Sequence, residues 1–118
     1  MKLIIKTILF WVLITSTAVF AELAKVKVNG FGIECEMVGS GKHTVLLEAG
    51  GSAGLSDWDP IYNSLTKYAK VIRYSRIGNG GSAQIKKNYS SEQYATEALL
   101  LLKALKIEEP VVYVAHSY

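Results

Sequence analysis

The sequence holds a single cysteine, Cys35, among its 118 residues. This excludes an intrachain disulfide and a cysteine-based metal cluster. Cys35 stands in the stretch FGIECEMV, where apolar and acidic residues alternate, so we expect a small buried side chain on a strand. Hydrophobic residues make up 50% of the chain and charged residues 19%, a balance typical of globular rather than disordered proteins. The length predicts at most one domain.

Acidic residues are absent from the first 21 positions, which carry Lys2 and Lys6. An apolar run follows and ends in a small-residue site at Ala21, the pattern of a secretory signal peptide cleaved after that alanine. The apolar run of about 15 residues is short for a membrane-spanning helix, which needs roughly 20. We therefore expect residues 1–21 to direct export to the periplasm or the extracellular space. An uncleaved membrane anchor is the alternative, and no stable anchor is expected after cleavage.

Net positive charge is small in residues 22–118, which we expect to form the domain. Removal of residues 1–21 takes away two lysines and no acidic residue, which lowers the formal net charge from +3 to +1. The adjacent Lys86 and Lys87 are expected in a solvated loop rather than in a basic stripe. The composition therefore argues against a nucleic-acid partner.

Alternating strands and helices predict an α/β domain. Residues 24–38 form two alternating runs split by Asn29 and Gly30, which predicts an antiparallel hairpin. The apolar runs HTVLLEAG, KVIRYS and VVYVA predict three further strands. The continuous apolar character of VVYVA predicts a fully buried strand of a parallel sheet. The expected order is a hairpin followed by β-α-β-α-β, with right-handed crossovers and both faces of the sheet covered.

Two helices are expected between these strands. The stretch WDPIYNSLTKY has apolar residues at helical spacing, and Pro60 is tolerated in the first turn. The second helix is expected from about Ser91 to Lys106, where Ser90 and Gln93 have the spacing of a capping box. The expected apolar faces are Trp58, Ile61, Tyr62, Leu65 and Tyr68 in the first helix, and Tyr94, Ala98, Leu101, Leu102 and Leu105 in the second.

Three loops, EAGGSAG, SRIGNGGS and HSY, follow the predicted parallel strands at their carboxyl ends, where ligands bind in such sheets. In HSY, Ser117 follows the last strand and the small Ala115, as in a sharp turn that exposes a nucleophilic hydroxyl. Ala115 replaces the first glycine of the pattern G-x-S-x-G, and the second glycine position lies beyond Tyr118. The alternative is that Ser117 has no chemical role. Gly50 and Gly51 would likewise be ordinary turn glycines if they have only a structural role.

The stretch GNGGSA, with Gly78, Gly80 and Gly81, follows a predicted strand and partly matches the G-x-G-x-x-G pattern of dinucleotide sites. It lacks an immediate helix start and an acidic residue at the expected distance. Turn formation is therefore the better interpretation.

These stretches together resemble the N-terminal part of an α/β-hydrolase, from about Lys25 to Tyr118. VLLEAGGSAGLSDWDP resembles the oxyanion loop of the family, and VAHSY resembles its nucleophile elbow. RYSRIGNGGS resembles the family segment Tyr-Asp-Arg-x-Gly-x-Gly-x-Ser, with Ser75 in place of the usual aspartate. The expected fold is thus an α/β-hydrolase domain truncated after the elbow.

The resemblance implies an acyl-transfer site with Ser117 as the nucleophile. The backbone N–H groups of Gly51 and Tyr118 would hold the oxyanion. A small-molecule acyl substrate is implied, with no metal and no organic cofactor. His116 is expected to have a structural role and His43 to lie at the opposite edge of the sheet, so the acidic residue and the histidine of the triad would both lie downstream of Tyr118.

Two hypotheses follow from the missing triad partners. In the first, the chain is the inactive N-terminal fragment of an exported serine hydrolase that acts on ester, amide or related acyl bonds. In the second, it is a non-catalytic interaction or decoy protein that needs a partner to complete its sheet, because an unpaired apolar strand at the sheet edge invites association.

Overall fold

The computed structural model describes residues 23–87 and 89–118. The predicted signal peptide, residues 1–21, lies outside the described residues. Within them, none of the helices is long and apolar enough to cross a membrane.

The described residues form a five-stranded mixed sheet in the order β1-β2-β4-β3-β5. β1 pairs with β2 and β2 with β4 in antiparallel fashion, whereas β3 pairs in parallel with both β4 and β5. The hairpin and the parallel strands confirm the predicted architecture. The strands are β1 (Ala24–Val28), β2 (Phe31–Val38), β3 (Thr44–Glu48), β4 (Lys70–Tyr74) and β5 (Val111–Ala115).

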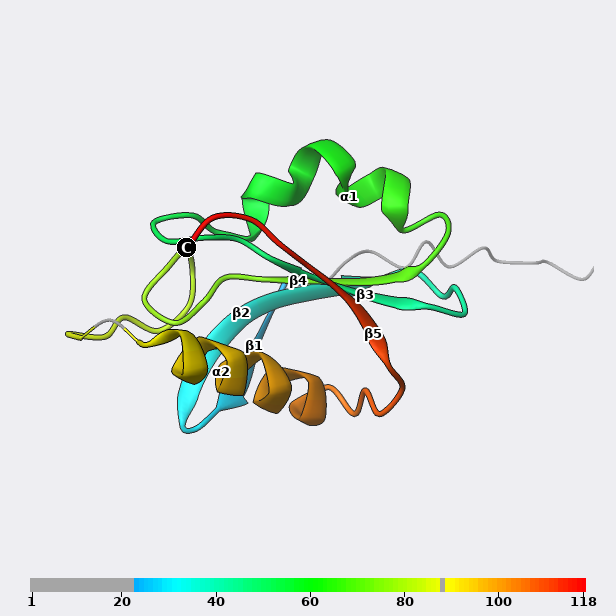
Figure 1. Ribbon diagram of the computed structural model, residues 1–118. Coiled ribbons are helices and arrows are strands. Elements are labelled where there is room, and N and C mark those ends of the chain that lie inside the picture. The colour runs from blue at the N-terminus through cyan, green and yellow to red at the C-terminus, as the bar shows by residue number, and fades with distance from the viewer. Residues whose placement is uncertain (1–22, 88) are drawn as a thin grey trace, which may run out of the picture.

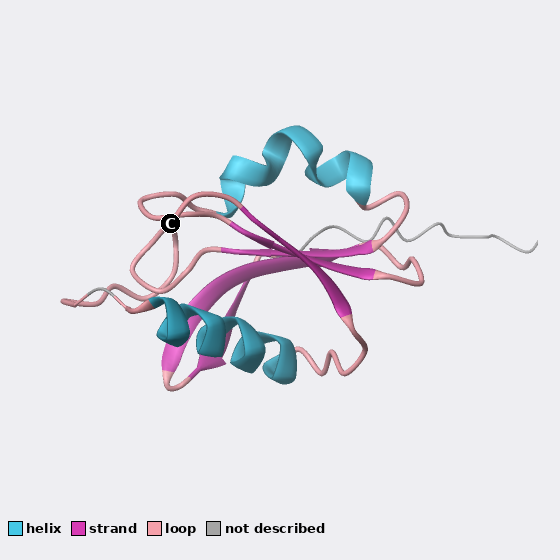
Figure 2. Ribbon diagram, in the orientation of Figure 1, coloured by secondary structure: helices cyan, strands magenta, loops and turns pink. Residues whose placement is uncertain are grey.

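Helices cover both faces of the sheet. The short 3₁₀ helix η1 (Leu55–Trp58) leads into α1 (Asp59–Leu65), and α2 (Ser91–Ala104) follows the long loop after β4. Figure 1 shows α1 above the sheet and α2 below it, and Figure 2 shows the same layers by type of secondary structure. The loops that follow β3, β4 and β5 meet at one edge, where the C-terminus also lies.

The turn of the hairpin sets which side chains of β2 face the core. Asn29 and Gly30 have φ angles of 48° and 84°, as a two-residue hairpin turn with two left-handed positions requires. Val28 then pairs with Phe31. In this register Cys35 is buried, as predicted, and burial raises the pKa of its thiol to about 11.

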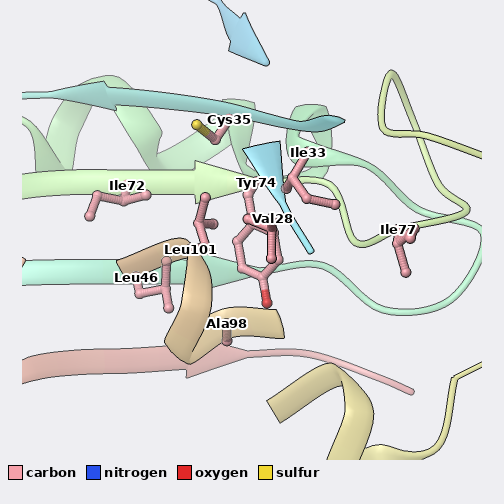
Figure 3. Packing of buried hydrophobic residues seen from close by; sticks show 9 residues of the cluster. All are labelled: Val28, Ile33, Cys35, Leu46, Ile72, Tyr74, Ile77, Ala98 and Leu101. Carbon is pink, nitrogen blue, oxygen red and sulfur yellow. The ribbon is translucent and has the colours of Figure 1, made fainter. Parts of the chain in front are cut away.

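The larger hydrophobic core lies between the sheet and α2. Figure 3 shows Leu46 of β3 and Ile72 and Tyr74 of β4 close to Leu101 of α2. Leu101 is fully buried. The complete cluster is Val28, Ile33, Cys35, Leu46, Ile72, Tyr74, Ile77, Ala98 and Leu101.

The start of α2 is the predicted capping box. The Ser90 hydroxyl accepts a hydrogen bond from the Gln93 N–H at 3.3 Å, and the Gln93 side chain accepts one from the Ser90 N–H at 2.9 Å. The helix ends at Ala104, two residues before the expected Lys106, because Lys106 has a φ of 58° and leaves the helical conformation.

The first helix is shorter than the sequence predicts. The apolar spacing predicts that Ile61 and Tyr68 share the buried face with Trp58 and Tyr62, and this is wrong. The helix ends at Leu65, so Tyr68 lies in the following turn and is 81% exposed, while Ile61 is also exposed. Only Trp58 and Tyr62 are buried beneath it.

An arginine on the sheet holds η1 and α1 in place. The guanidinium of Arg73 in β4 donates to Glu36 of β2 at 2.5 Å, pairs with Asp59 at the start of α1 and donates to the Leu55 carbonyl at 3.3 Å. It also lies 3.9 Å from the ring centre of Tyr62. The three polar contacts join two strands to the segment that follows the loop after β3.

The predicted burial of β5 is wrong. The strand has the expected bounds, but Val112 and Tyr113 are about half exposed and Val114 is 36% exposed. The reason is its place in the sheet, because β5 lies at the edge and pairs with β3 alone among the described strands.

We expect Leu101→Ala to lower the free energy of unfolding by about 2–5 kcal/mol, because it leaves a cavity between α2 and the sheet. Leu99→Ala is the matched control, since Leu99 lies on the same helix and is 67% exposed, and it should change stability by less than about 0.5 kcal/mol. Urea unfolding followed by circular dichroism measures both. Equal effects of the two substitutions would contradict the packing of α2 described above.

Candidate functional site

The turn after β5 places Ser117 in a conformation that serine rarely adopts. Its φ angle is 58°, in the left-handed region that costs a non-glycine residue free energy and is typical of functional turns. A strained turn directly after a strand is the geometry expected of a nucleophile elbow. Ser117 thus has a left-handed backbone conformation in the segment that follows β5.

The loop after β3 lies against this turn. A Cβ atom on Gly50 would lie 2.7 Å from the Ser117 Cβ and 2.9 Å from the His116 carbonyl oxygen, and one on Gly51 would lie 2.8 Å from the Tyr118 carbonyl oxygen. Distances below 3.0 Å to backbone atoms cannot be relieved by a change of rotamer. Glycine is therefore required at both positions for close backbone approach, which is more specific than the role of an ordinary turn glycine.

Gly51 lies against the turn that contains Ser117 and Tyr118. The Gly51 N–H donates to the Tyr118 carbonyl oxygen at 3.0 Å, so Gly51 faces the residue that follows Ser117. In this arrangement the Gly51 N–H already has a hydrogen-bond acceptor, the Tyr118 carbonyl oxygen.

The two histidines lie where the sequence predicts. The ring of His116 packs edge-on against Trp58 at 5.1 Å, and its Nε2 atom lies 3.6 Å from the Asp57 carboxylate. These contacts hold the side chain against η1. His43 is exposed at the opposite edge of the sheet, where its carbonyl accepts a hydrogen bond from the Lys70 N–H that begins β4.

A buried carboxylate that the sequence analysis left without a role lies at the centre of this edge. Glu48, the last residue of β3, is 2% exposed. It accepts hydrogen bonds from the hydroxyls of Tyr74 and Tyr113 and pairs with the guanidinium of Arg76, whose Nε lies 2.7 Å from Oε1. The sequence signal was present, since a glutamate within the apolar run VLLEA requires buried partners.

The tyrosine hydroxyls act as donors to Glu48 throughout the neutral range. Burial, and next the Glu48 carboxylate, raise the pKa of both Tyr74 and Tyr113 above the ordinary tyrosine value. Both hydroxyls therefore stay protonated and can donate to the Glu48 side chain opposite Arg76.

Arg76 also lines a cavity of about 200 Å³ beside the elbow. Its guanidinium lies 4.6 Å from the ring centre of Tyr94 and 5.9 Å from that of Tyr118. Because Glu48 pairs with the guanidinium, the cavity wall carries a neutralised rather than a free positive charge. The cavity is lined by Gly51, Ser52, Arg76, Asn79, Tyr89, Tyr94 and Tyr118.

The glycine-rich loop after β4 packs against a carboxylate of the protein itself. Glu34 of β2 accepts hydrogen bonds from the Ser75 hydroxyl at 2.7 Å and from the Gly81 N–H at 2.8 Å. The Ser75 hydroxyl in turn accepts one from the Leu55 N–H at 2.9 Å. Ser75 and Glu34 together thus place a carboxylate beside the position where the related motif has an aspartate. The loop N–H of Gly81 is directed at Glu34, which supports turn formation over phosphate binding.

A second buried glutamate supports the same loop from α2. Glu97 is 3% exposed and accepts a hydrogen bond from the Ile77 N–H at 3.1 Å. Burial raises its pKa to about 7, although the hydrogen bond from Ile77 acts in the opposite direction. The described residues contain no group of three or more His, Cys, Asp or Glu side chains that could hold a metal ion.

Comparisons with known proteins agree with this architecture. No family model matches the sequence. The uncharacterized protein YqjL of Bacillus subtilis is 31% identical over 80 residues, which are 68% of this chain and 32% of that protein. A membrane phospholipase A described as a bacterial virulence factor has a TM-score of 0.76 and 22% identity, over 82% of this chain and 32% of its own. The Cif epoxide hydrolase of Acinetobacter nosocomialis has a TM-score of 0.74 and 24% identity, over 81% and 30%. The chain spans about a third of the length of each.

Gly50→Ala should displace the turn at Ser117, because the added methyl group meets backbone that cannot move aside. We expect a loss of about 1–3 kcal/mol in unfolding free energy and large shifts of the Ser117 and Tyr118 amide signals in NMR spectra. Gly32→Ala is the control, since its Cβ would meet only the Lys25 side chain at 3.6 Å. Unchanged signals at the turn in Gly50→Ala would contradict the close approach.

Glu97→Gln should change how stability depends on pH. The pKa of Glu97 in the fold, about 7, lies above its ordinary value of 4.5, so the neutral side chain favours the folded state. Its contribution is full below pH 4.5 and is lost as the pH rises through about 7. The variant should lack this loss and be more stable than the wild type at pH 8 by on the order of 2 kcal/mol.

Urea unfolding at pH 4.5, 6 and 8 measures this effect. The exposed Glu108 supplies the control, and Glu108→Gln should keep the pH dependence of the wild type. Parallel curves for wild type and Glu97→Gln would show that Glu97 does not titrate differently on folding.

Proposed function

The chain has the N-terminal part of the α/β-hydrolase fold, and on this premise we propose that it carries the nucleophile of a serine hydrolase. The substrates would be small molecules with an ester, amide or related acyl bond. Ser117 would attack the acyl carbonyl, and the N–H groups of Gly51 and Tyr118 would bind the resulting oxyanion.

The observation that carries this proposal is the backbone of Ser117 against Gly50. The φ of 58° at Ser117, two residues beyond the end of β5, carries a conformational cost of the kind that is common at functional turns. Gly50 lies so close to this turn that a side chain at its position would clash with Ser117 and His116. The strained backbone at Ser117 and the space that Gly50 leaves for it therefore support a common function for the two loops.

The proposed reaction also needs a base to accept the proton of Ser117. The contacts of His116 are directed at Trp58 and Asp57 on η1, and His43 lies at the far edge of the sheet. We therefore assign the histidine base and its acidic partner to residues outside this chain. The 118-residue chain alone would then be inactive, because an unassisted serine hydroxyl is a weak nucleophile at neutral pH.

The exposed edge of β5 favours a second candidate function. Val112, Tyr113 and Val114 are 36–54% exposed on a strand without charge or proline, and such edges readily pair with another strand. A non-catalytic interaction or decoy protein that completes its sheet with a partner would use this edge. It would not need the strained serine, which is why the hydrolase remains the first proposal.

A fluorophosphonate probe tests the proposal at Ser117. Because the base is missing, we expect labelling of the 118-residue chain at pH 7 to be slower than in an intact serine hydrolase by on the order of 10⁶-fold. The residual label, located by mass spectrometry after long exposure, should lie on Ser117 in preference to other serines. Ser117→Ala should abolish it, whereas Ser64→Ala on the exposed side of α1 should leave it unchanged.

Two outcomes would contradict parts of the proposal. Rapid stoichiometric labelling of Ser117 would show that the chain already contains a base. Residual label spread evenly over exposed serines would refute Ser117 as the nucleophile and favour the interaction protein.

A further inference from the structure

Glu48 joins the two loops that would form the site. It is the last residue of β3 and precedes Gly50 by two positions and Gly51 by three. Its carboxylate accepts a hydrogen bond from Tyr113 on β5, four residues before Ser117. One side chain therefore connects the strand before the oxyanion loop to the strand before the elbow.

A third segment is attached to the same carboxylate. Tyr74 ends β4, and Arg76 lies two residues further in the glycine-rich loop; both donate to Glu48. At the backbone, the His116 N–H also donates to the Glu48 carbonyl at 3.3 Å. The carboxyl ends of the three adjacent strands β4, β3 and β5 thus meet at Glu48.

We infer that Glu48 is a positioning residue whose carboxylate keeps the Gly51 N–H aligned with the turn at Ser117. The roles of Gly51 and Ser117 in this inference rest on the proposed hydrolase function. The alignment itself is a property of the described chain and can be measured without catalysis.

The three donors of the group require a side chain with two acceptor oxygens. A buried carboxylate is stable only where hydrogen bonds and opposite charge compensate for lost solvation, and here two hydroxyls and a guanidinium do so. A glutamine at position 48 would offer a single acceptor oxygen and would direct an amide N–H₂ at donors. At least one of Tyr74, Tyr113 and Arg76 would lose its partner, and the tie between β3 and β5 would weaken.

Amide hydrogen exchange of the ¹⁵N-labelled full chain tests this alignment at Gly51. The Gly51 N–H is hydrogen-bonded to the Tyr118 carbonyl, so its exchange rate reports how often the oxyanion loop separates from the elbow. We expect Glu48→Gln to raise that rate about tenfold relative to the amides of the β1–β2 hairpin, since hydrogen bonds to a charged group are among the stronger ones. Tyr113→Phe, which keeps the ring and removes only the hydroxyl, should raise it about threefold.

Glu109→Gln is the matched control. Glu109 accepts hydrogen bonds from Thr44 at 2.8 Å and Lys70 at 3.3 Å, so it ties β3 to β4 at the opposite end of these strands. Its substitution should leave Gly51 exchange unchanged relative to the hairpin.

Wild-type exchange at Gly51 in both Glu48→Gln and Tyr113→Phe would overturn the inference. Acceleration of all amides in the same proportion would also overturn it, because Glu48 would then contribute only to global stability. If Glu48→Gln fails to fold, the result for Tyr113→Phe decides. Failure of the proposed function would be seen in a separate experiment. In that case the fluorophosphonate label would not favour Ser117, while the exchange rates of Gly51 would still change as expected.

Discussion

The close approach of the backbone after β3 to the backbone after β5 is the constraint on which the candidate site depends. The two strands run parallel, with Thr44 opposite Val111 and Glu48 opposite Ala115, so their continuations leave the sheet side by side. Neighbouring strands lie about 4.8 Å apart, and a turn toward the neighbour leaves no space for a side chain there. Gly50 supplies that space, and Ser117 adopts a left-handed conformation to use it.

Carboxyl groups that accept hydrogen bonds from the protein organise the rest of this edge. Glu34, Glu48 and Glu97 come from β2, β3 and α2, and each accepts hydrogen bonds from groups in or beside the loops. A polar group removed from water is costly unless it is hydrogen-bonded, so each of these side chains restricts the loop that supplies its donors. The glycine-rich loop after β4 is ordered in this way around Glu34, which favours turn formation over phosphate binding as the role of its partial dinucleotide pattern.

Much of the fold could be predicted from the sequence because its signals are local. Asn29 and Gly30 determine the hairpin turn, and Ser90 with Gln93 determines the start of α2, through contacts within a few residues. Burial could not be predicted in the same way. The apolar run of β5 resembles a central strand, but its exposure depends on the order of strands in the sheet. Tyr68 matches the helical spacing of α1, yet the helix ends before it.

The candidate site divides along the same line. Ser117 could be proposed from the sequence because the elbow is a contiguous pattern, and Gly51 because a resemblance supplied a role for it. The partners of Glu48 could not be found, since Tyr74, Arg76 and Tyr113 are separated from it by 26 to 65 residues and meet only through the parallel register of three strands. Long-range polar networks of this kind leave only one trace in a sequence, a charged residue inside an apolar strand.

The position of β5 connects the two proposed functions physically. This strand carries the turn at Ser117 and the hydroxyl that reaches Glu48, yet among the described strands it is hydrogen-bonded on one side only. A strand paired on both edges is held more firmly than an edge strand, because each further ladder must open before the strand can move. Any polypeptide that pairs with the free edge of β5 would therefore also restrict the elbow. Completion of the sheet, which defines the interaction hypothesis, would thus also restrict the turn that the hydrolase hypothesis places in the site.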